Sequence, residues 1–343
     1  MTDSVELVND KRRFDTKEGE NILSAALRQG IVIPHNCRNG FCGSCMGLLH
    51  SGKVEYEGDE RPVALSEEKE KEGYILCCKA ITKGDARLEV ETIDAVADIE
   101  IKTLPCRVNR LEKMADDVML VELKLPPHEK FEFYAGQYLD FLLRDGRRRS
   151  FSMANSPFSD GVIELHIRQV PDGFFTGQVF NEMKVKDMLR IQGPFGTFLL
   201  RDDSSRPAIL IAGGTGFAPL KSMLEKVRKE GCDRPLQLYW GARAGKDLYF
   251  DKQLKQWAEE LDCLTYTPVL SEPKTADDWQ GATGWVHEAV LADFPDLAGL
   301  DVYASGPPPM INAIKQSFSA QGLEQGRLYF DSFEYANDGE ESS

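Results

Sequence analysis

The sequence predicts a multidomain protein that combines a small α+β domain, an antiparallel β-barrel and an α/β domain with a parallel sheet. Three observations predict this. The chain has 343 residues, enough for two or three domains of ordinary size. Three cysteines and several glycines share a loop at 35–47, flanked by short strand and helix patterns. Turn-separated β-rich runs then fill 106–201, and strands alternate with helices from residue 207 onward.

Composition excludes several classes of function. Hydrophobic residues make up 42% and charged residues 28% of the chain, as in a soluble globular protein. The net charge of −15 argues against nucleic acid as a partner, because phosphate contacts need a basic surface. The first residues, MTDSVELVNDKRRF, lack the basic and apolar regions of a signal peptide. The longest apolar run, at 207–220, is too short and too rich in glycine to span a bilayer.

We therefore expect a cytoplasmic protein that does not span a membrane. In that compartment the eight cysteines indicate metal ligands or free thiols rather than disulfides. Around the cysteine loop, 5–10 and 11–16 are predicted to form two short strands joined by a turn. A helix is predicted over 19–30, with Gly30 as its stop. Residues 48–58 are predicted as a hairpin-like return and 86–93 as a closing strand.

Cys37, Cys42 and Cys45 have the spacing Cys-x4-Cys-x2-Cys. Two kinds of site compete: a zinc site and an iron–sulfur cluster. Zinc sites usually offer a second Cys pair or two histidines downstream, whereas this spacing followed by one distant Cys is typical of a plant-type [2Fe–2S] cluster. The interleaved glycines let the backbone approach the sulfurs closely. Cys77 and Cys78 both follow, and in an extended segment they point to opposite sides, so only one can face the cluster.

This stretch resembles the plant-type ferredoxin domain that is fused to flavoprotein reductases. In that family the fourth ligand lies in a Leu-x-Cys-x-Ala segment, which Leu76–Ala80 matches with Cys78 as the ligand. The resemblance implies a β-grasp domain over 1–96 that holds a [2Fe–2S] cluster on Cys37, Cys42, Cys45 and Cys78, with Cys77 only a neighbour.

Composition changes after this domain. Residues 97–104 are predicted as a linker, and 105–204 as an antiparallel β-barrel with one helix over 176–183. The predicted barrel strands lie in 106–114, 117–126, 136–145, 148–157, 161–170 and 187–201.

The run Arg149-Ser150-Phe151-Ser152 resembles the Arg-x-Tyr-Ser flavin motif of the ferredoxin–NADP reductase superfamily. The resemblance implies that Arg149 pairs with flavin phosphates, since a guanidinium suits a diphosphate. It also implies that the Phe151 ring packs on the flavin and that the Ser152 hydroxyl lies at its reactive edge. Phenylalanine replaces the family's tyrosine, so a phenol hydrogen bond is lost. Taken alone, these residues also fit a basic strand edge with polar alternation.

A second segment supports the flavin. His166, Arg168, Gly173 and Thr176 lie in HIRQVPDGFFTG, which resembles the family's second phosphate segment, where a helix N-terminus binds the anion. Residues 193–200, GPFGTFLL, resemble the family's barrel-closing strand. Together these resemblances imply FAD rather than FMN.

From residue 205 to 335 the pattern predicts a Rossmann-like nucleotide-binding domain, followed by a disordered acidic tail at 336–343. Strands are predicted at 208–212, 236–243, 264–271, 301–308 and 327–333, and helices at 220–231, 251–261, 285–294 and 310–322. This alternation predicts a parallel sheet with helices on both faces.

The turn GGTGFAP at 213–219 follows a strand and opens a helix, as a dinucleotide turn must. Pro219 stands where an ordinary fingerprint has glycine, and this departure resembles the nicotinamide-binding turn of the same superfamily. The resemblance places Gly214, Thr215, Gly216 and Pro219 at the nicotinamide dinucleotide. A tight turn in a strand–helix unit is the simpler alternative.

A second nicotinamide segment is suggested by YASGPPPM at 303–310, which resembles the family's Cys-Gly-Pro-Pro-x-Met segment. It implies that Gly306 and Pro307 lie beside the nicotinamide, although Ser305 replaces the family's cysteine. Phe333 falls where the family places a ring near the flavin, but core packing explains an aromatic there equally well. Ser152, Thr215 and Phe333 are thus the predicted catalytic positions.

The choice of nicotinamide depends on residues 240–250. Arg243 and Lys246 could bind a 2′-phosphate, whereas Asp247 would repel one. The fused ferredoxin family is mostly NADH-dependent, so NADH is predicted and NADPH stays open.

The resemblance covers residues 1 to about 335. It implies a reductase that passes electrons from NADH through FAD and a [2Fe–2S] cluster, one at a time, to a partner protein. That partner is predicted to be an oxygenase or hydroxylase component or a deoxysugar dehydratase, since the chain resembles both oxygenase reductase components and the CDP-6-deoxyglucoseen reductases. The alternative is a redox sensor or electron carrier with a catalytically weak flavin module.

Overall fold

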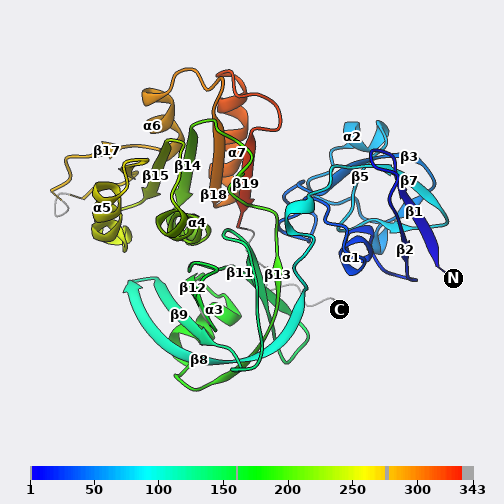
Figure 1. Cartoon of the computed structure of the whole chain (residues 1–343), viewed down its shortest axis with the longest axis horizontal. Helices are drawn as coiled ribbons and strands as arrows, with labels where there is room; N and C mark the ends of the chain where they lie inside the picture. Colours follow the sequence, from blue (N-terminus) through cyan, green and yellow to red (C-terminus); the bar gives the residue numbers. More distant parts are fainter. Residues whose placement is uncertain (1, 160, 275–277, 334–343) are drawn as a thin grey trace. The chain divides into compact units, whose positions relative to one another are not determined.

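A computed structural model describes residues 2–159, 161–274 and 278–333. It divides into two compact units, Met1–Glu100 and Ile101–Ser343 (Figure 1). No helix in the described part of the chain is long and apolar enough to cross a membrane. The tail predicted at 336–343 lies outside the described residues.

The first unit is built on a five-stranded sheet with the order β2-β1-β7-β3-β5. Its strands are β1 (Asp3–Leu7), β2 (Arg13–Thr16), β3 (Met46–Ser51), β5 (Tyr74–Leu76) and β7 (Ala86–Glu89). Strand β1 runs parallel to β7 and antiparallel to β2. Helix α1 (Ile22–Arg28) is capped by Asn21, whose side chain accepts a hydrogen bond from the Ser24 N–H, and it buries Ile22 and Leu23 in the core below the sheet.

The prediction of a hairpin over 48–58 is wrong. Strand β3 pairs with β5 and β7, whereas β4 (Val54–Glu55) pairs with β6 (Ile81–Thr82) in a separate two-stranded sheet. Contacts of Lys83, which directly follows β6, explain why β4 pairs with β6. The Lys83 N–H donates to the Lys53 carbonyl, and the Lys83 ammonium pairs with Glu55 at 2.6 Å. The rest of this unit comprises the 3₁₀ turns η1 (Glu57–Asp59) and η2 (Asp94–Val96) and the exposed helix α2 (Glu67–Lys71).

The second unit begins with a six-stranded antiparallel barrel sheet of order β11-β10-β13-β8-β9-β12. The strands are β8 (Lys102–Ala115), β9 (Val118–Lys124), β10 (Tyr138–Leu142), β11 (Arg148–Ser152), β12 (Val162–Arg168) and β13 (Met188–Phe195). Helix α3 (Phe174–Asn181) lies between β12 and β13 in the chain.

Two expectations about the barrel differ from the structure. The predicted linker at 97–104 contains the start of β8, which begins at Lys102. Residues 193–200 do not close the barrel, because only 193–195 belong to β13, which lies inside the sheet between β10 and β8. The two ends of the sheet meet instead through the antiparallel bridge between Met153, just after β11, and Leu165 of β12.

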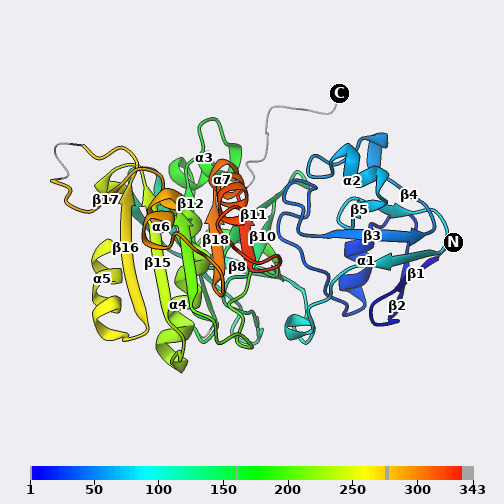
Figure 2. The ribbon, with the colours of Figure 1, turned by 90° about the horizontal axis from the view of Figure 1, so that it is seen from above.

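The remainder of this unit is a six-stranded parallel sheet of order β17-β16-β15-β14-β18-β19. Its strands are β14 (Ala208–Gly213), β15 (Leu236–Ala242), β16 (Leu264–Leu270), β17 (Ala282–Thr283), β18 (Asp301–Gly306) and β19 (Leu328–Ser332). Figure 2 shows β16 and β15 side by side with α5 close by. The order places β14 at the centre, with the strand ends of β15 and β18 on either side of its turn.

Helices cover both faces of the parallel sheet, as predicted. Alternate residues of β14 point to opposite sides, so Leu210 packs with α4 (Phe217–Glu230) and α5 (Asp251–Glu260). Ile209 and Ile211 pack on the other side with α6 (Val286–Asp293) and α7 (Pro308–Ser319). A strand that is covered by helices on both faces needs apolar side chains on both sides, which explains the continuous apolar run AILIA.

Candidate functional site

The cysteine loop of the first unit holds an unusual backbone. Arg38, Gly40 and Gly43 all have positive φ angles, of 58°, 91° and 80°. A side chain at Gly40 would also meet Pro62 and Lys79 at 3.1 Å, so the loop is tightly packed there. The Ala64 N–H donates to the Gly40 carbonyl at 3.0 Å, which fixes the segment 62–64 against the loop.

The four predicted ligands stand in two pairs. The Cys42 N–H donates to Cys37 Sγ at 3.3 Å, and the Cys78 N–H donates to Cys45 Sγ at 3.4 Å. Contact between the Cys37 and Cys42 thiols raises the pKa of Cys37 and lowers that of Cys42. In the described residues, no group of three or more His, Cys, Asp or Glu side chains is placed for a single metal ion. Two cysteine pairs are the donor set that a [2Fe–2S] cluster takes, with two thiolates on each iron.

The neighbouring Cys77 faces the core instead. Its side chain is 0% exposed and packs in the apolar core of the first unit. Burial is the main cause that raises the pKa of its thiol. The pKa of Cys78 is raised first by its contact with the Cys45 thiol, so Cys78 is the member of this adjacent pair that meets the loop.

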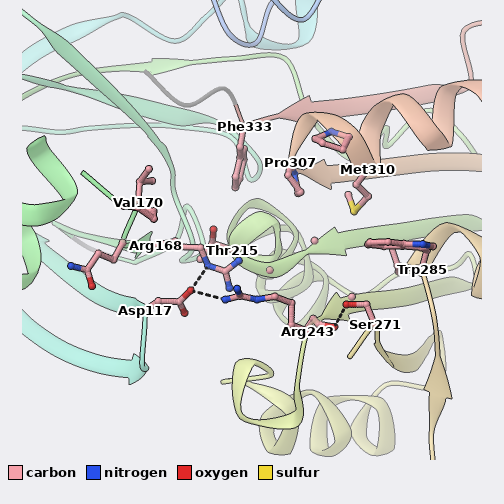
Figure 3. A pocket seen from close by; sticks show the side chains of 18 of the residues that line it. Asp117, Arg168, Val170, Thr215, Arg243, Ser271, Trp285, Pro307, Met310 and Phe333 are labelled. Atoms are coloured by element: carbon pink, nitrogen blue, oxygen red, sulfur yellow. Dashed lines mark hydrogen bonds and ion pairs between the residues drawn. The ribbon is translucent and has the colours of Figure 1, made fainter. Parts of the chain in front are cut away.

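The second unit holds a cavity of about 1460 Å³ at the carboxyl ends of the parallel strands (Figure 3). This volume exceeds the roughly 300–1,000 Å³ typical of a single small-molecule site. Its wall includes seven of the predicted catalytic and cofactor-binding residues, namely Arg168, Gly173, Gly214, Thr215, Arg243, Pro307 and Phe333. It also includes residues that sequence reasoning missed, among them Asp117, Ser271, Trp285 and Met310.

The turn after β14 is packed directly on the turn after β18. A Cβ atom at Gly216 would lie 2.0 Å from the Ser305 carbonyl oxygen, so no side chain fits there. The Trp240 Nε1–H donates to the Gly214 carbonyl at 2.9 Å and holds the turn from the β15 side. Gly216 and Pro219 are buried and Gly306 packs on Gly213, so these three shape the turn while Gly214 and Thr215 line the cavity.

Phe333 is hydrogen-bonded to the end of β18. Its N–H donates to the Gly306 carbonyl at 2.9 Å, directly after β19, and its ring lines the cavity opposite Thr215 in Figure 3. Ser305, at the family's cysteine position, is 0% exposed and its hydroxyl has no hydrogen-bond partner among the described residues.

The phosphate segment lies where β12 leads into α3. No side chain caps the helix at Gly173, so its first N–H groups point outward as they do in anion sites. The Thr176 hydroxyl accepts from the Val170 N–H at 3.1 Å and fixes this turn. Arg168 Nε is buried and makes no hydrogen bond in the described part of the chain, while Asp117 Oδ2 lies 3.3 Å away as its ion-pair partner. A partly buried guanidinium whose Nε–H makes no hydrogen bond, beside an uncapped helix, fits the diphosphate of a dinucleotide.

The flavin-motif residues lie on β11, outside the wall of this cavity. The Arg149 side chain is half-buried, and burial lowers its pKa from the ordinary value. The Phe151 ring packs against Phe141 and Phe175 with centroids 5.9 and 5.7 Å away. The Ser150 hydroxyl donates to Asp140 at 2.7 Å, and Ser152 donates to Asp331 of β19 at 3.2 Å. Ser152 thus joins the barrel to the end of the parallel sheet near Phe333.

His166 has a structural environment rather than a place in the cavity. Its imidazole is buried, with Nε2 3.0 Å from Glu164 Oε1 and Nδ1 3.1 Å from the Tyr249 hydroxyl. The Lys221 ammonium of α4 lies 3.0 Å from the same Glu164 oxygen. This network ties β12 to the helix that follows the nucleotide turn. No spacing rule in the sequence indicates it, since Glu164 and His166 of β12 lie more than 50 residues before Lys221 and Tyr249.

Comparison with known proteins identifies three domains. Residues 6–83 match the 2Fe-2S iron-sulfur cluster binding domain, 105–199 the oxidoreductase FAD-binding domain and 210–316 the oxidoreductase NAD-binding domain. These ranges contain, in turn, the two cysteine pairs, the flavin-motif strand and the packed nucleotide turns.

Relatives match along nearly the whole chain. The CDP-6-deoxy-L-threo-D-glycero-4-hexulose-3-dehydrase reductase of Yersinia pestis is 41% identical, covering 93% of this chain and 95% of the relative. The reductase component of propane 2-monooxygenase from Gordonia sp. (strain TY-5) is 32% identical over 93% of this chain and 94% of its own. The crystal structure of the Amycolatopsis cytochrome P450 reductase GcoB has a TM-score of 0.81 and 31% identity, covering 97% of this chain and 99% of that one.

The donor sets, the cavity and these matches agree on the cofactors: a [2Fe–2S] cluster, FAD and NAD(H). The chain belongs to the family of iron–sulfur flavoprotein reductases, the NAD(P)H-dependent oxidoreductases that serve as electron-transfer components for other enzymes.

Proposed function

We propose that this reductase takes electrons from NADH and delivers them, one at a time, to a dehydratase that acts on a nucleotide-linked deoxysugar. The observation that carries this choice of partner is the 41% identity to a CDP-hexulose dehydrase reductase, against 32% for an oxygenase reductase component. When bound, FAD supplies the exchange between a two-electron hydride and single electrons, and the cluster supplies one-electron transfer.

The residues have the following proposed roles. Cys37, Cys42, Cys45 and Cys78 hold the cluster, and their backbone N–H contacts to sulfur favour the thiolates. Arg149 and the uncapped start of α3 bind the FAD phosphates. Ser152 and Phe333 border the flavin ring. The hydrogen bond from Ser152 to Asp331 brings the end of β11 to the end of β19, which Phe333 directly follows. Thr215 and Pro307 orient the nicotinamide from the two packed turns.

We also propose the domain order of a cluster domain at 1–96, an FAD barrel at 105–204 and an NAD domain at 205–335, in a protein that works in the cytoplasm. The domain matches and the division of the chain at Glu100 support this order.

The partner would dock at the cluster loop. Phe41 is 46% and Val63 74% exposed, and both are large apolar side chains. Val63 belongs to the segment that packs on the loop through Pro62 and Ala64. Two exposed apolar residues beside the cluster offer a contact surface through which an electron leaves.

The test is reconstitution. The purified reductase and NADH are combined with a CDP-6-deoxyhexulose dehydratase and its substrate, and the reduced sugar is quantified. We expect product only when all components are present. If an oxygenase component accepts the electrons and the dehydratase does not, the partner class is wrong; the 0.81 TM-score to a P450 reductase makes this the second candidate. Failure to reduce even an artificial acceptor would favour a sensor or carrier with a weak flavin module.

A further inference from the structure

One carboxylate in the cavity is shared by two guanidinium groups. Asp117 lies in the turn between β8 and β9 of the barrel, and its Oδ2 is 3.3 Å from Arg168 Nε and 3.3 Å from Arg243 Nη2. In Figure 3, dashed lines join Asp117 to both of these side chains. The other oxygen, Oδ1, is buried and has no hydrogen-bond partner in the described residues.

The neighbouring aspartate repeats the arrangement at the surface. Asp116 pairs with the Lys246 ammonium, and both side chains are largely exposed. Asp247 lies 3.9 Å from Arg243 Nε, while its other contact is to the Ala244 N–H at 3.1 Å. The two cations that could bind a 2′-phosphate, Arg243 and Lys246, therefore each already face a barrel aspartate.

The position of Arg243 makes this pairing relevant to the cofactor. In open parallel sheets a dinucleotide lies across the carboxyl ends of the strands, with its diphosphate at the first turn and its adenosine ribose at the end of the neighbouring strand. Here the first turn follows β14, and Arg243 directly follows β15. A substituent on the ribose 2′-oxygen would therefore meet Arg243 and Asp117.

We propose that Asp117 makes the enzyme select NADH over NADPH, so that a residue of the flavin barrel sets the specificity of the nucleotide domain. This inference rests on the proposed binding of a nicotinamide dinucleotide in the cavity. A 2′-hydroxyl can donate a hydrogen bond to the Asp117 carboxylate. A 2′-phosphate carries a charge of roughly −1.5 to −2, so it is repelled by Asp117 and must displace that carboxylate from Arg243.

Displacing the Asp117 carboxylate from Arg243 is costly for a second reason. Asp117 Oδ1 already lacks a partner, and its side chain is only 26% exposed, so a carboxylate separated from Arg243 would keep little solvation. Arg168, its other partner, packs its guanidinium against the turn after β14, where a Cβ atom at Gly214 would lie 2.5 Å from Arg168 Nη1. The ion pairs thus neutralise the cations that would otherwise bind a 2′-phosphate.

The experiment compares 5′-AMP with 2′,5′-ADP, which differ by the 2′-phosphate. Binding to the FAD-loaded protein is measured by calorimetry for the wild type and for Asp117→Asn. We expect wild type to prefer 5′-AMP. In the variant we expect about tenfold tighter binding of 2′,5′-ADP, because one like charge beside the phosphate is removed, and about twofold to threefold weaker binding of 5′-AMP. The ratio of kcat/KM for NADPH to that for NADH should rise in parallel.

Two further variants define the mechanism. The tighter binding of 2′,5′-ADP should disappear when Asp117→Asn is combined with Arg243→Ala, since the freed Arg243 guanidinium causes it. Asp116→Asn, at an exposed site where folding is not at stake, should give a smaller gain of about twofold through Lys246. As a matched control, Asp202→Asn removes an exposed aspartate that pairs with Lys226 at 2.8 Å and should leave the ratio unchanged.

The outcomes separate the two proposals. If wild type binds neither 5′-AMP nor NAD⁺, the proposed dinucleotide cavity is wrong. If it binds NAD⁺ but neither aspartate variant shifts the ratio, only the selectivity proposal is overturned. A gain that persists without Arg243 would also overturn it, since general charge rather than this ion pair would then be the cause. Tighter 2′,5′-ADP binding that depends on Arg243 supports it.

Discussion

The cluster loop and the dinucleotide cavity are built in opposite ways. Three of the four candidate cluster ligands lie within nine residues, and only Cys78 comes from another part of the chain. The cavity takes its wall from the barrel turn at Asp117, the start of α3 and the ends of several parallel strands, so residues from Asp117 to Phe333 contribute. The cluster site is mainly a single loop with unusual backbone angles, whereas the cavity is formed where several strands, a helix and a barrel turn meet.

This difference predicts how each site fails. A metal cluster needs every ligand, so losing one thiolate removes the site as a whole. A cavity with many contacts loses affinity in steps, since each contact contributes only a fraction of the binding free energy. The following predictions test this contrast.

The largest effect is expected from Cys42→Ser. The variant should lose the visible absorbance of the [2Fe–2S] cluster and the transfer of electrons to a protein acceptor. Reduction of its flavin by NADH should persist, because the cluster residues belong to a separate compact unit. Iron analysis and stopped-flow reduction of the flavin measure the two results.

The adjacent cysteines provide the matched control. Cys78→Ser should behave like Cys42→Ser, whereas Cys77→Ala should keep its cluster and lose only some stability through a small core cavity. Loss of the cluster in Cys77→Ala with retention in Cys78→Ser would reverse the assignment of the fourth ligand. Zinc without iron in the wild type would exclude the cluster.

A graded effect is expected for Arg149→Ala in the second unit. A charge-assisted hydrogen bond to phosphate contributes roughly 1.5–3 kcal/mol, so FAD should bind about 10- to 150-fold more weakly. Flavin titration of the apoprotein measures this. Arg144→Ala, which removes an exposed arginine from the turn before β11, is the control. Unchanged FAD affinity in Arg149→Ala would remove this residue from the site.

Backbone packing at the nucleotide turn predicts a loss of similar size. In Gly216→Ala the new methyl group would lie 2.0 Å from the Ser305 carbonyl oxygen, so the two turns must separate. We expect about 1–3 kcal/mol lower stability and weaker NADH binding. Gly177→Ala is the control, because nothing lies within 4 Å of its Cβ and helix α3 should gain about 0.5–1 kcal/mol. Equal melting temperatures would show that the turns are not tightly packed.

The same contrast explains what could be predicted from the sequence. The cysteine loop was readable because its ligands share one short stretch, and the β14 turn because glycine spacing and a following helix are local signals. The prediction of a hairpin at 48–58 failed because Lys53 and Glu55 find their partner in Lys83, and nothing local encodes that contact.

Residues brought together by the fold stayed hidden. Asp117 pairs with Arg243 across 126 positions of the chain, and Ser152 bonds to Asp331 across 179. His166 was expected at a cofactor because of its place in a motif, but its two ring nitrogens contact Glu164 and Tyr249. A motif identifies the strand, whereas the neighbouring elements decide where each side chain of that strand points.

The buried network at His166 predicts how stability depends on pH. Burial lowers the pKa of His166; it also opposes ionisation of Glu164, but contacts with His166 and Lys221 outweigh this and lower the pKa of Glu164 to about 2. Both groups therefore bind protons more readily in the unfolded chain. Stability should fall as the pH drops below about 6.5, where unfolded histidine protonates, and fall further below about 4.5, where glutamate does.

Thermal unfolding of the second unit, followed by flavin fluorescence, measures this. In Glu164→Gln the decline below about pH 4.5 should be shallower than in wild type, because one of the two proton-binding groups is gone. A decline of the same steepness would mean that other groups dominate acid unfolding.

The smallest effect is expected from surface charge near the cluster. Most acids there are already paired: Glu55 with Lys83, Glu67 with Lys71, Glu70 with Arg61 and Glu72 with Lys69. Among described residues, Glu57, Asp59 and Glu60 have no such ion pair, and they lead into the segment that packs on the loop at Pro62. The acidic residues near the cluster loop would therefore steer a basic partner only weakly.

Exposed charges act over a Debye length of roughly 8 Å at physiological salt, so steering should be visible only in dilute buffer. Reversing Glu57, Asp59 and Glu60 to lysine should slow the reduction of cytochrome c, a basic acceptor, by about twofold to fivefold at low salt. The effect should vanish at high salt, and reduction of the anion ferricyanide should become faster. Reduction of the flavin by NADH is the internal control. If both acceptors respond in the same direction, the change lies in the cluster itself, and the acidic segment steers no partner.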